Sequence, residues 1–256
     1  MKKVLALAAV IGALTTAASA ATLLTEDFNF TGNLTANGWA AHSGAGTQAI
    51  DTTAGLTYTG YAGSGIGNAA NLDNTGEDDN RLLPAPITTA SDTYASFLVN
   101  IPTGTTVTDG YFFHFGQNDA GVLNTSIFRG KTWTTTDGTG DYELGFAYGG
   151  SVISKTNLNL VFGTTYLVVV KYSFLTGTAT DDTVSGWVFT GTAPGTEPAP
   201  TVGPLANDAT TEPTNIGAIA LRQFVATERV VVDGIRVTTE WPLGVQTAVG
   251  DWTAYN

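Results

Sequence analysis

The sequence contains no cysteine among its 256 residues. Disulfide bonds, thiolate metal sites and cysteine-linked lipid anchors are therefore excluded. A chain of this length can bury a sizeable hydrophobic core. Its stability must come from that core, with a bound metal ion as the remaining possible cross-link.

Basic residues are also scarce. Ten Lys and Arg side chains stand against 22 Asp and Glu, and charged residues make up only 12% of the chain. Without Lys2 and Lys3, 8 basic and 22 acidic residues remain, a formal net charge of −14. Such a surface repels phosphate backbones and anionic lipids, so we expect no nucleic-acid partner.

A long apolar run is absent everywhere except at the N-terminus. Lys2 and Lys3 precede an apolar stretch at residues 4–14, and Ala18 and Ala20 form an A-x-A cleavage site. This pattern predicts a secretory signal peptide over residues 1–20, a secreted or cell-surface location, and no membrane insertion after cleavage. We expect one domain over residues 21–242 and a C-terminal tail over 243–256.

Amphipathic helical patterns are missing after the leader, whereas Gly, Thr, Val and aromatic residues are abundant. The chain is organised around residues 164–190, which alternate as two strands joined by a Gly- and Asp-containing turn. Strands are also predicted at residues 23–30, 56–61, 93–101, 110–116, 125–134, 142–148, 216–224 and 229–240. The sequence therefore predicts an all-β protein, a two-sheet antiparallel jelly-roll sandwich.

Two segments carry more specific expectations. The stretch 71–81 contains Glu77, Asp78 and Asp79 between Gly and Asn residues, which indicates a solvated acidic loop. Residues 82–88 contain two prolines, which permit at most an edge strand. In the strand at 110–116, strict alternation places Tyr111 on the opposite face from His114.

Catalytic motifs are not found. The glutamates form no run of carboxylates on one strand face, as a glycosidase requires. Ser64 lacks the flanking pattern of a hydrolase nucleophile, and His42 and His114 cannot form a zinc site alone. We therefore expect no catalytic residues and a protein that is not an enzyme.

Three stretches resemble the laminin-G-like and concanavalin-A-like jelly rolls of secreted bacterial proteins. They are EDFNF at 26–30, TTYLVVVKYSF at 164–174 with SGWVF at 185–189, and VVVDGIRV at 230–237. The segments NGWAAHSGAG, NLDNTGEDDNR and GAIALRQ are similar to a module of Bacteroidetes-type cell-surface proteins. The resemblance implies that the first and last strands pair and bring the chain ends together.

The same resemblance implies a structural calcium site, because jelly-roll carbohydrate-binding modules often share a Ca²⁺ between these two strands. Glu26, Asp27 and Asp233 are the candidate ligands, since hard cations prefer carboxylate oxygens. The acidic stretch 73–79 is a weaker second candidate. The alternative is that Asp233 fills a turn before Gly234 while Glu26 and Asp27 are solvated.

A glycan site needs aromatic faces and nearby polar groups. The candidates are Arg129 and Trp133, which alternation places on one strand face, with His114, Glu143 and Trp187 on neighbouring strands; the alternative places both tryptophans in the core. The predicted function is a non-catalytic glycan-binding or adhesion module whose partners are extracellular glycans or other surface proteins. The alternatives are a structural subunit of an extracellular layer or filament and, last, a polysaccharide-acting glycosidase or lyase.

Overall fold

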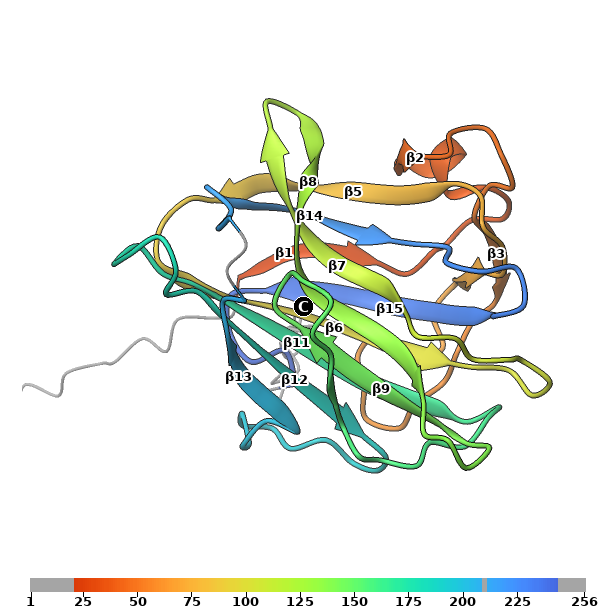
Figure 1. Cartoon of the computed structure of the whole chain (residues 1–256). Helices are drawn as coiled ribbons and strands as arrows, with labels where there is room; N and C mark the ends of the chain where they lie inside the picture. The colour runs from red at the N-terminus through yellow and green to blue at the C-terminus, as the bar shows by residue number, and fades with distance from the viewer. Residues whose placement is uncertain (1–20, 209–210, 244–256) are drawn as a thin grey trace, which may run out of the picture.

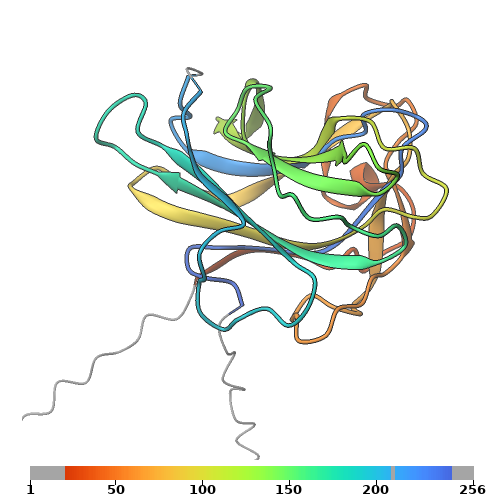
Figure 2. The same cartoon turned by 60° about the horizontal axis from the view of Figure 1, so that its bottom comes forward.

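The computed structural model describes residues 21–208 and 211–243. Two antiparallel sheets lie face to face in a sandwich, confirming the predicted fold class (Figures 1 and 2). The predicted signal peptide over 1–20 and most of the predicted tail over 243–256 lie outside the described residues. No helix within the described ranges is long and apolar enough to cross a membrane.

The larger sheet has eight strands and the smaller has seven. The eight-stranded sheet runs β13 (Val202–Ala206), β12 (Thr183–Phe189), β11 (Thr165–Phe174), β6 (Ser91–Asn100), β15 (Val230–Thr238), β4 (Asn68–Leu72), β3 (Asp51–Ala54), with β1 (Thr22–Glu26) paired to β15. The seven-stranded sheet runs β10 (Ser154–Lys155), β9 (Tyr142–Ala147), β8 (Val122–Thr136), β7 (Gly110–Asp119), β14 (Ile216–Leu221), β5 (Asp78–Ile87), β2 (Ala40–Ser43).

The predicted hairpin at 164–190 forms β11 and β12, and β11 also pairs with β6 along its whole length. The predicted contact between the first and last strands is confirmed, because β1 pairs with β15. One 3₁₀ helix, η1 (Leu34–Asn37), ends at Gly38, whose positive φ of 90° closes the turn.

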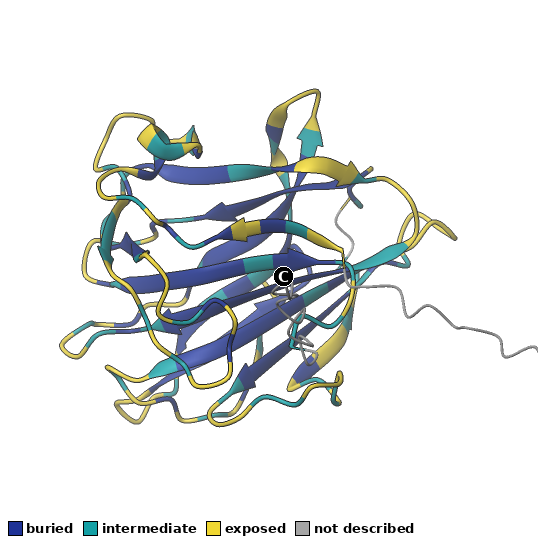
Figure 3. Ribbon diagram, turned by 180° about the vertical axis from the view of Figure 1, so that it is seen from behind, coloured by how far each residue is buried: buried dark blue, intermediate teal, exposed yellow. Residues whose placement is uncertain are grey.

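The core lies between the sheets and is built by alternation. On β11 Val168 and Val170 point into it, while Val169 belongs to a separate cluster on the outer side of the sheet. Burial follows the strands and exposure follows the loops (Figure 3). Apolar burial of this kind contributes about 25 cal/mol per Å² and is the main stabilising term.

The predicted strand at 56–61 is wrong, because this segment is a loop. Side chains, rather than a neighbouring strand, satisfy its backbone: Asp233 accepts from Leu56 N at 2.6 Å and Ser64 accepts from Tyr58 N at 2.6 Å. The buried Tyr61 hydroxyl donates to Gly234 O at 2.6 Å. These hydrogen bonds, two of them to distant parts of the chain, therefore override the apolar alternation of this segment.

Residues 82–87 form the second half of β5 and lie at an edge of the sheet, as predicted. β14 pairs with this half on one side, whereas β2 pairs only with residues 78–80 on the other. Pro84 and Pro86 fall where the β14 register jumps between Leu82 and Ile87, so the missing N–H groups interrupt an irregular part of the ladder. The solvated loop predicted at 71–81, in contrast, is wrong, since this stretch supplies the end of β4 and the start of β5.

Candidate functional site

The face of the seven-stranded sheet that points away from the core carries a group of aromatic and basic side chains. Tyr111 of β7 lies opposite Trp133 of β8, and their ring centroids are 5.3 Å apart. Both side chains are partly exposed. We call this surface the outer face.

A β-bulge decides which β7 side chains reach this face. The register advances from Tyr111 opposite Trp133 to Phe113 opposite Thr132, so Phe112 is an extra residue. As a result Phe112 and Phe113 both face the core, where their rings lie 6.2 and 4.6 Å from that of Phe97. The predicted alternation is wrong here, because Tyr111 lies on the same face as His114.

Two cations flank the Tyr111 ring. The Lys131 ammonium is 4.7 Å and the Arg222 guanidinium 4.3 Å from its centroid, distances at which cation–π attraction operates. Arg222 also lies 4.7 Å from the Phe224 ring centroid and 3.8 Å from an Asp78 carboxylate oxygen. Burial lowers the pKa of Lys131, with the nearby Arg129 charge adding to the effect. Positive charge is thus held close to aromatic surface on a chain that is acidic overall.

His114 lies beneath this group rather than at its surface. Its side chain is fully buried, stacks on Phe128 with centroids 4.0 Å apart, and approaches His42 at 5.9 Å. Burial lowers the pKa of His114 to about 3 and that of His42 to about 4, so both are uncharged at neutral pH. His114 therefore supports Phe128 and His42 from below and does not meet a ligand.

Two hollows open on this side of the sandwich. The first, of about 470 Å³, contains Lys131, Arg129 and Phe128 in its wall. The second, of about 510 Å³, contains His42 and Arg81. Because His42 and Phe128 are themselves in ring contact at 5.7 Å, the two hollows lie on either side of one aromatic pair. Together they offer an extended binding surface.

The other predicted glycan-site residues are distributed differently. Arg129 is buried, with its guanidinium 5.6 Å from the Tyr148 ring and donating to the carbonyls of Phe128 and Thr211. Glu143 is buried and accepts from Asn157 N at 2.9 Å. Both side chains thus have hydrogen-bond partners within the protein. Of these two residues, only Arg129 lines one of the two hollows.

Trp187 does not join Trp133. It lies on the outer side of the other sheet, in a cluster with Tyr94 and Val169. Its indole donates to Pro198 O at 3.1 Å, and the Trp241 ring covers it at 5.2 Å. The placement of Trp187 in the predicted glycan site is therefore wrong, and the alternative of a buried packing role is the observed one.

The predicted calcium ligands have protein partners. Glu26 is buried and accepts from Phe28 N at 2.8 Å and Trp39 Nε1 at 2.9 Å, and it forms an ion pair with Arg81. The alternative of a solvated Glu26 is therefore wrong.

Asp27 pairs with Arg236 at 2.5 Å. Asp233 is fully buried, and its carboxylate accepts from Leu56 N and Gly234 N, each at 2.6 Å. Burial raises the pKa of Asp233 to about 6. The turn-filling alternative describes Asp233 well, and the structure does not bring the three carboxylates together as one ligand set.

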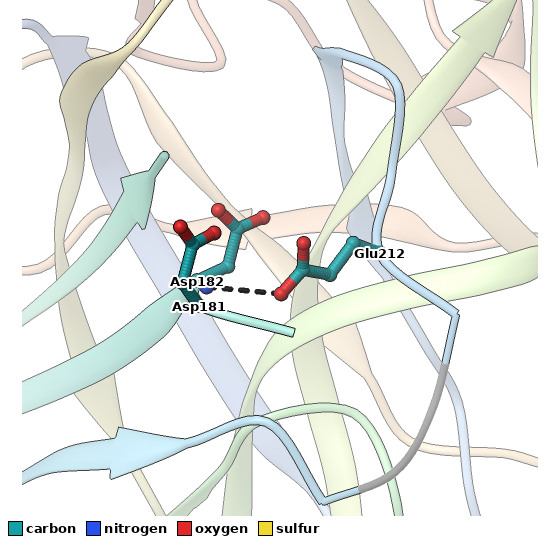
Figure 4. Close-up of side chains that lie close together, drawn as sticks. All are labelled: Asp181, Asp182 and Glu212. Atoms are coloured by element: carbon teal, nitrogen blue, oxygen red, sulfur yellow. Dashed lines mark hydrogen bonds between the residues drawn. The ribbon is translucent and has the colours of Figure 1, made fainter. Parts of the chain in front are cut away.

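The described residues do contain one group of three carboxylates whose oxygens lie within 4.8 Å of one another: Asp181, Asp182 and Glu212 (Figure 4). Asp182 is fully buried, its backbone N donates to Glu212 at 2.9 Å, and its carboxylate accepts from Tyr172 at 2.5 Å. Such a set has the ligand chemistry to coordinate a divalent cation. The stretch 73–79 supplies no such group.

Sequence reasoning missed Tyr111, Lys131 and Arg222 as site residues, and considered His42 only as a zinc ligand. The bulge at Phe112 hid Tyr111, and Arg222 follows β14 with no local signal that distinguishes it. For the acidic group, the Asp181–Asp182 pair was visible, but Glu212 comes from a distant loop that only the fold brings near.

No family model and no curated protein matches the sequence. Among solved structures, the chain is similar to a marine alginate lyase from Aplysia kurodai, with 11% identity, TM-score 0.55, and 86% of this chain and 99% of that chain covered. It is also similar to an endo-β-1,4-glucuronan lyase from the fungus Trichoderma reesei, with 10% identity, TM-score 0.53, and 86% and 96% covered.

A third similar structure is an alginate lyase in complex with an alginate tetrasaccharide, with 15% identity, TM-score 0.50, and 84% and 95% covered. At these identities the likeness concerns the fold. The protein has a concanavalin-A-like jelly-roll fold, a fold that includes polysaccharide-binding proteins.

Proposed function

We propose that the protein is a secreted, non-catalytic module that binds an anionic polysaccharide on the outer face of the seven-stranded sheet. The observation that carries this proposal is the placement of positive charge. Of the 8 basic residues that follow the leader, four lie on this face or line its hollows: Arg81, Arg129, Lys131 and Arg222.

The pairing of these charges strengthens the argument. Among the described residues, no carboxylate oxygen lies within 4.0 Å of the Lys131 or Arg129 nitrogens, although the chain has 22 acidic residues. Lys131, beside a partly exposed Trp133, matches the needs of a charged sugar, which offers an apolar ring face and a carboxylate or sulfate. The Arg129 guanidinium is bonded to backbone carbonyls and adds positive charge beneath this surface.

The similar structures support the same class of ligand, since their names specify alginate and glucuronan, which are uronic acid polymers. From these polymers we infer only that a protein with this fold can bind a uronic acid chain. A polyanion is also the ligand that gains most from basic residues on a face of an otherwise acidic molecule, because the rest of the surface repels it.

Affinity electrophoresis in gels containing alginate, polyglucuronate or a neutral β-glucan tests the proposal. We expect retardation by the anionic polymers that weakens as salt increases, and none by the neutral polymer. Lys131→Met should weaken binding about tenfold, because it removes the charge and keeps the side-chain length. Lys155→Met, at the exposed β10 edge, is the matched control. Retardation by the neutral glucan equal to that by the anionic polymers would contradict the proposal. Equal retardation of Lys131→Met and wild type would contradict it as well.

One observation favours a second function, a lyase acting on the same polymer. An elimination needs a base to remove the proton beside the uronate carboxylate and a cation to stabilise that carboxylate. The uncharged His42 and the basic Arg81 line one hollow together. Incubation with polyglucuronate and alginate, followed by absorbance of the unsaturated product, tests this. Product formed by wild type and not by His42→Ala would establish the lyase over the non-catalytic module.

A further inference from the structure

Three consecutive acidic residues enter β5 with their side chains inside the protein. Glu77, Asp78 and Asp79 are 3%, 8% and 0% exposed. Asp78 has partners that offset its charge, because it accepts from Gln223 N at 2.9 Å and lies 3.8 Å from Arg222. The other two carboxyl groups have no basic partner among the described residues.

Glu77, which immediately precedes β5, is hydrogen-bonded to the segment 35–47. Its carboxylate accepts from Gly46 N at 2.7 Å and from the Thr35 hydroxyl at 3.3 Å, and its backbone N donates to Thr47 O at 2.8 Å. One side chain therefore bonds to both ends of the segment 35–47. That segment includes β2 and carries His42, which lines the second hollow.

Asp79 has no hydrogen-bond donor. Both carboxylate oxygens are buried and without a partner, and the residues opposite it on the neighbouring strands are Leu221 and Ala41. An ionised carboxylate in such a place, without hydrogen bonds or a counter-ion, is strongly disfavoured. A proton removes the charge and supplies the missing bond.

The charged groups near Asp79 act in the same direction. Glu77 and Asp78 are acidic. Arg81 on the same strand and Arg222, which follows the residue opposite Asp79, already pair with Glu26 and Asp78. Burial raises the pKa of Asp79 to about 7, and the negative charge of the nearby Glu77 carboxylate adds to the effect. Glu77 and Asp79 are two residues apart where the chain enters β5, so their side chains point to the same side of the extended backbone.

We propose that Asp79 is protonated and donates its hydrogen to the Glu77 carboxylate, and that this pair fastens the segment 35–47 to β5. Loss of the proton leaves two negative charges side by side in an apolar place, so the segment loosens as pH rises through neutrality. The segment forms part of the second hollow, so its loosening alters the outer face. That last consequence, and only that one, rests on the proposed function.

Proton linkage gives the direction in which stability changes with pH. Between pH 4 and 7 the folded state holds a proton on Asp79 that the unfolded state has released, so stability falls as pH rises across this range and levels off above it. Other buried carboxyl groups, among them Asp78 and Asp233, contribute in the same direction. The comparison of variants, rather than the wild-type curve alone, therefore isolates the pair.

The test measures melting temperature and hydrogen exchange from pH 5 to 8.5 in wild type, Asp79→Asn and the control Asp78→Asn. The new amide at position 79 donates an N–H to Glu77 at every pH. We expect wild type and Asp78→Asn to lose protection in residues 35–47, at least tenfold after correction for intrinsic exchange, and Asp79→Asn to keep it. Glu77→Gln, which removes the charge on the acceptor, should also make protection of residues 35–47 less dependent on pH. This variant replaces Asp79→Asn in the test if Asp79→Asn does not fold.

Identical pH profiles for wild type and Asp79→Asn would overturn the proposal. So would a rise in wild-type melting temperature at pH 8 on addition of calcium that Asp79→Asn lacks, because a divalent cation would then occupy the pair. Neither readout involves a glycan, so failure here is distinguishable from failure of the proposed function.

Discussion

Glu26 offers the sharpest test of how the hollow side of the sandwich is held together. Glu26→Ala removes the acceptor of Trp39 Nε1 and Phe28 N and the partner of Arg81 in one change. Because the carboxylate is only 5% exposed, water cannot easily replace it. Each of the two buried donors left without an acceptor costs about 1–3 kcal/mol, so the change costs about 3–5 kcal/mol in all, while Arg81, which is 29% exposed, can be hydrated.

For a domain of this size, each kcal/mol corresponds to about 2–4 °C in melting temperature. We therefore expect Glu26→Ala to melt about 6–20 °C below wild type. Circular dichroism melts and urea titrations at pH 7 measure the loss. Asp27→Ala is the matched control, because Asp27 is more exposed than Glu26 and its carboxylate is bonded to Arg236 rather than to the buried Trp39 and Phe28 donors, so we expect a smaller loss.

Equal losses in the two variants would refute the reasoning, because Glu26 would then be no more than a solvated charge. The calcium prediction can be checked in the same melts. If Glu26 serves Arg81 and Trp39, its effect persists in chelator. A calcium-dependent stabilisation that disappears in both Glu26→Ala and Asp233→Ala would instead assign these carboxylates to an ion.

Further outcomes follow from packing and charge. Gly186→Ala should destabilise the protein by about 1–3 kcal/mol in urea, because the new methyl would lie 2.5 Å from the Phe146 ring; an unchanged midpoint would contradict this packing. Trp187→Phe should lower the urea midpoint but leave polysaccharide retardation unchanged. Weaker retardation of this variant would show that Trp187 belongs to the binding site. Tyr172→Phe removes the hydroxyl that lowers the otherwise raised pKa of Asp182, so stability should fall more steeply than in wild type as pH rises from 4 to 7; a parallel profile would argue against the bond.

The strands with strong apolar alternation were predictable. Residues 93–101, 164–190 and 229–240 are dominated by side chains that must be buried, and burial fixes strand, face and register together. The loop at 56–61 has a similar pattern over a shorter length. There the Asp233 and Ser64 side chains bind the backbone. The Ser64 contact spans 6 residues, but the Asp233 contact spans 177, which no local sequence pattern can indicate.

Charged residues were the least predictable part of the site. Asp79 and Glu26 have the chemistry of surface residues, and only the fold places them inside. Tyr111 and His114 share a face because one extra residue in β7 reverses the alternation, and no residue in the sequence marks that bulge. Trp133 lies partly exposed on the outer face, where β8 keeps regular pairing with β9 around it, and its part in glycan binding stays a prediction.

The position of β15 has a consequence for the order of events in folding. This strand, the last described in the chain, lies between β6 and β4 and also pairs with β1. Without it, the larger sheet separates into a β6–β11–β12–β13 part and a β3–β4 part, and β1 has no partner. Closure therefore requires contacts between residues near 22, 70, 95 and 235, a high contact order that slows folding. During synthesis the core therefore stays open until β15 has been added to the chain.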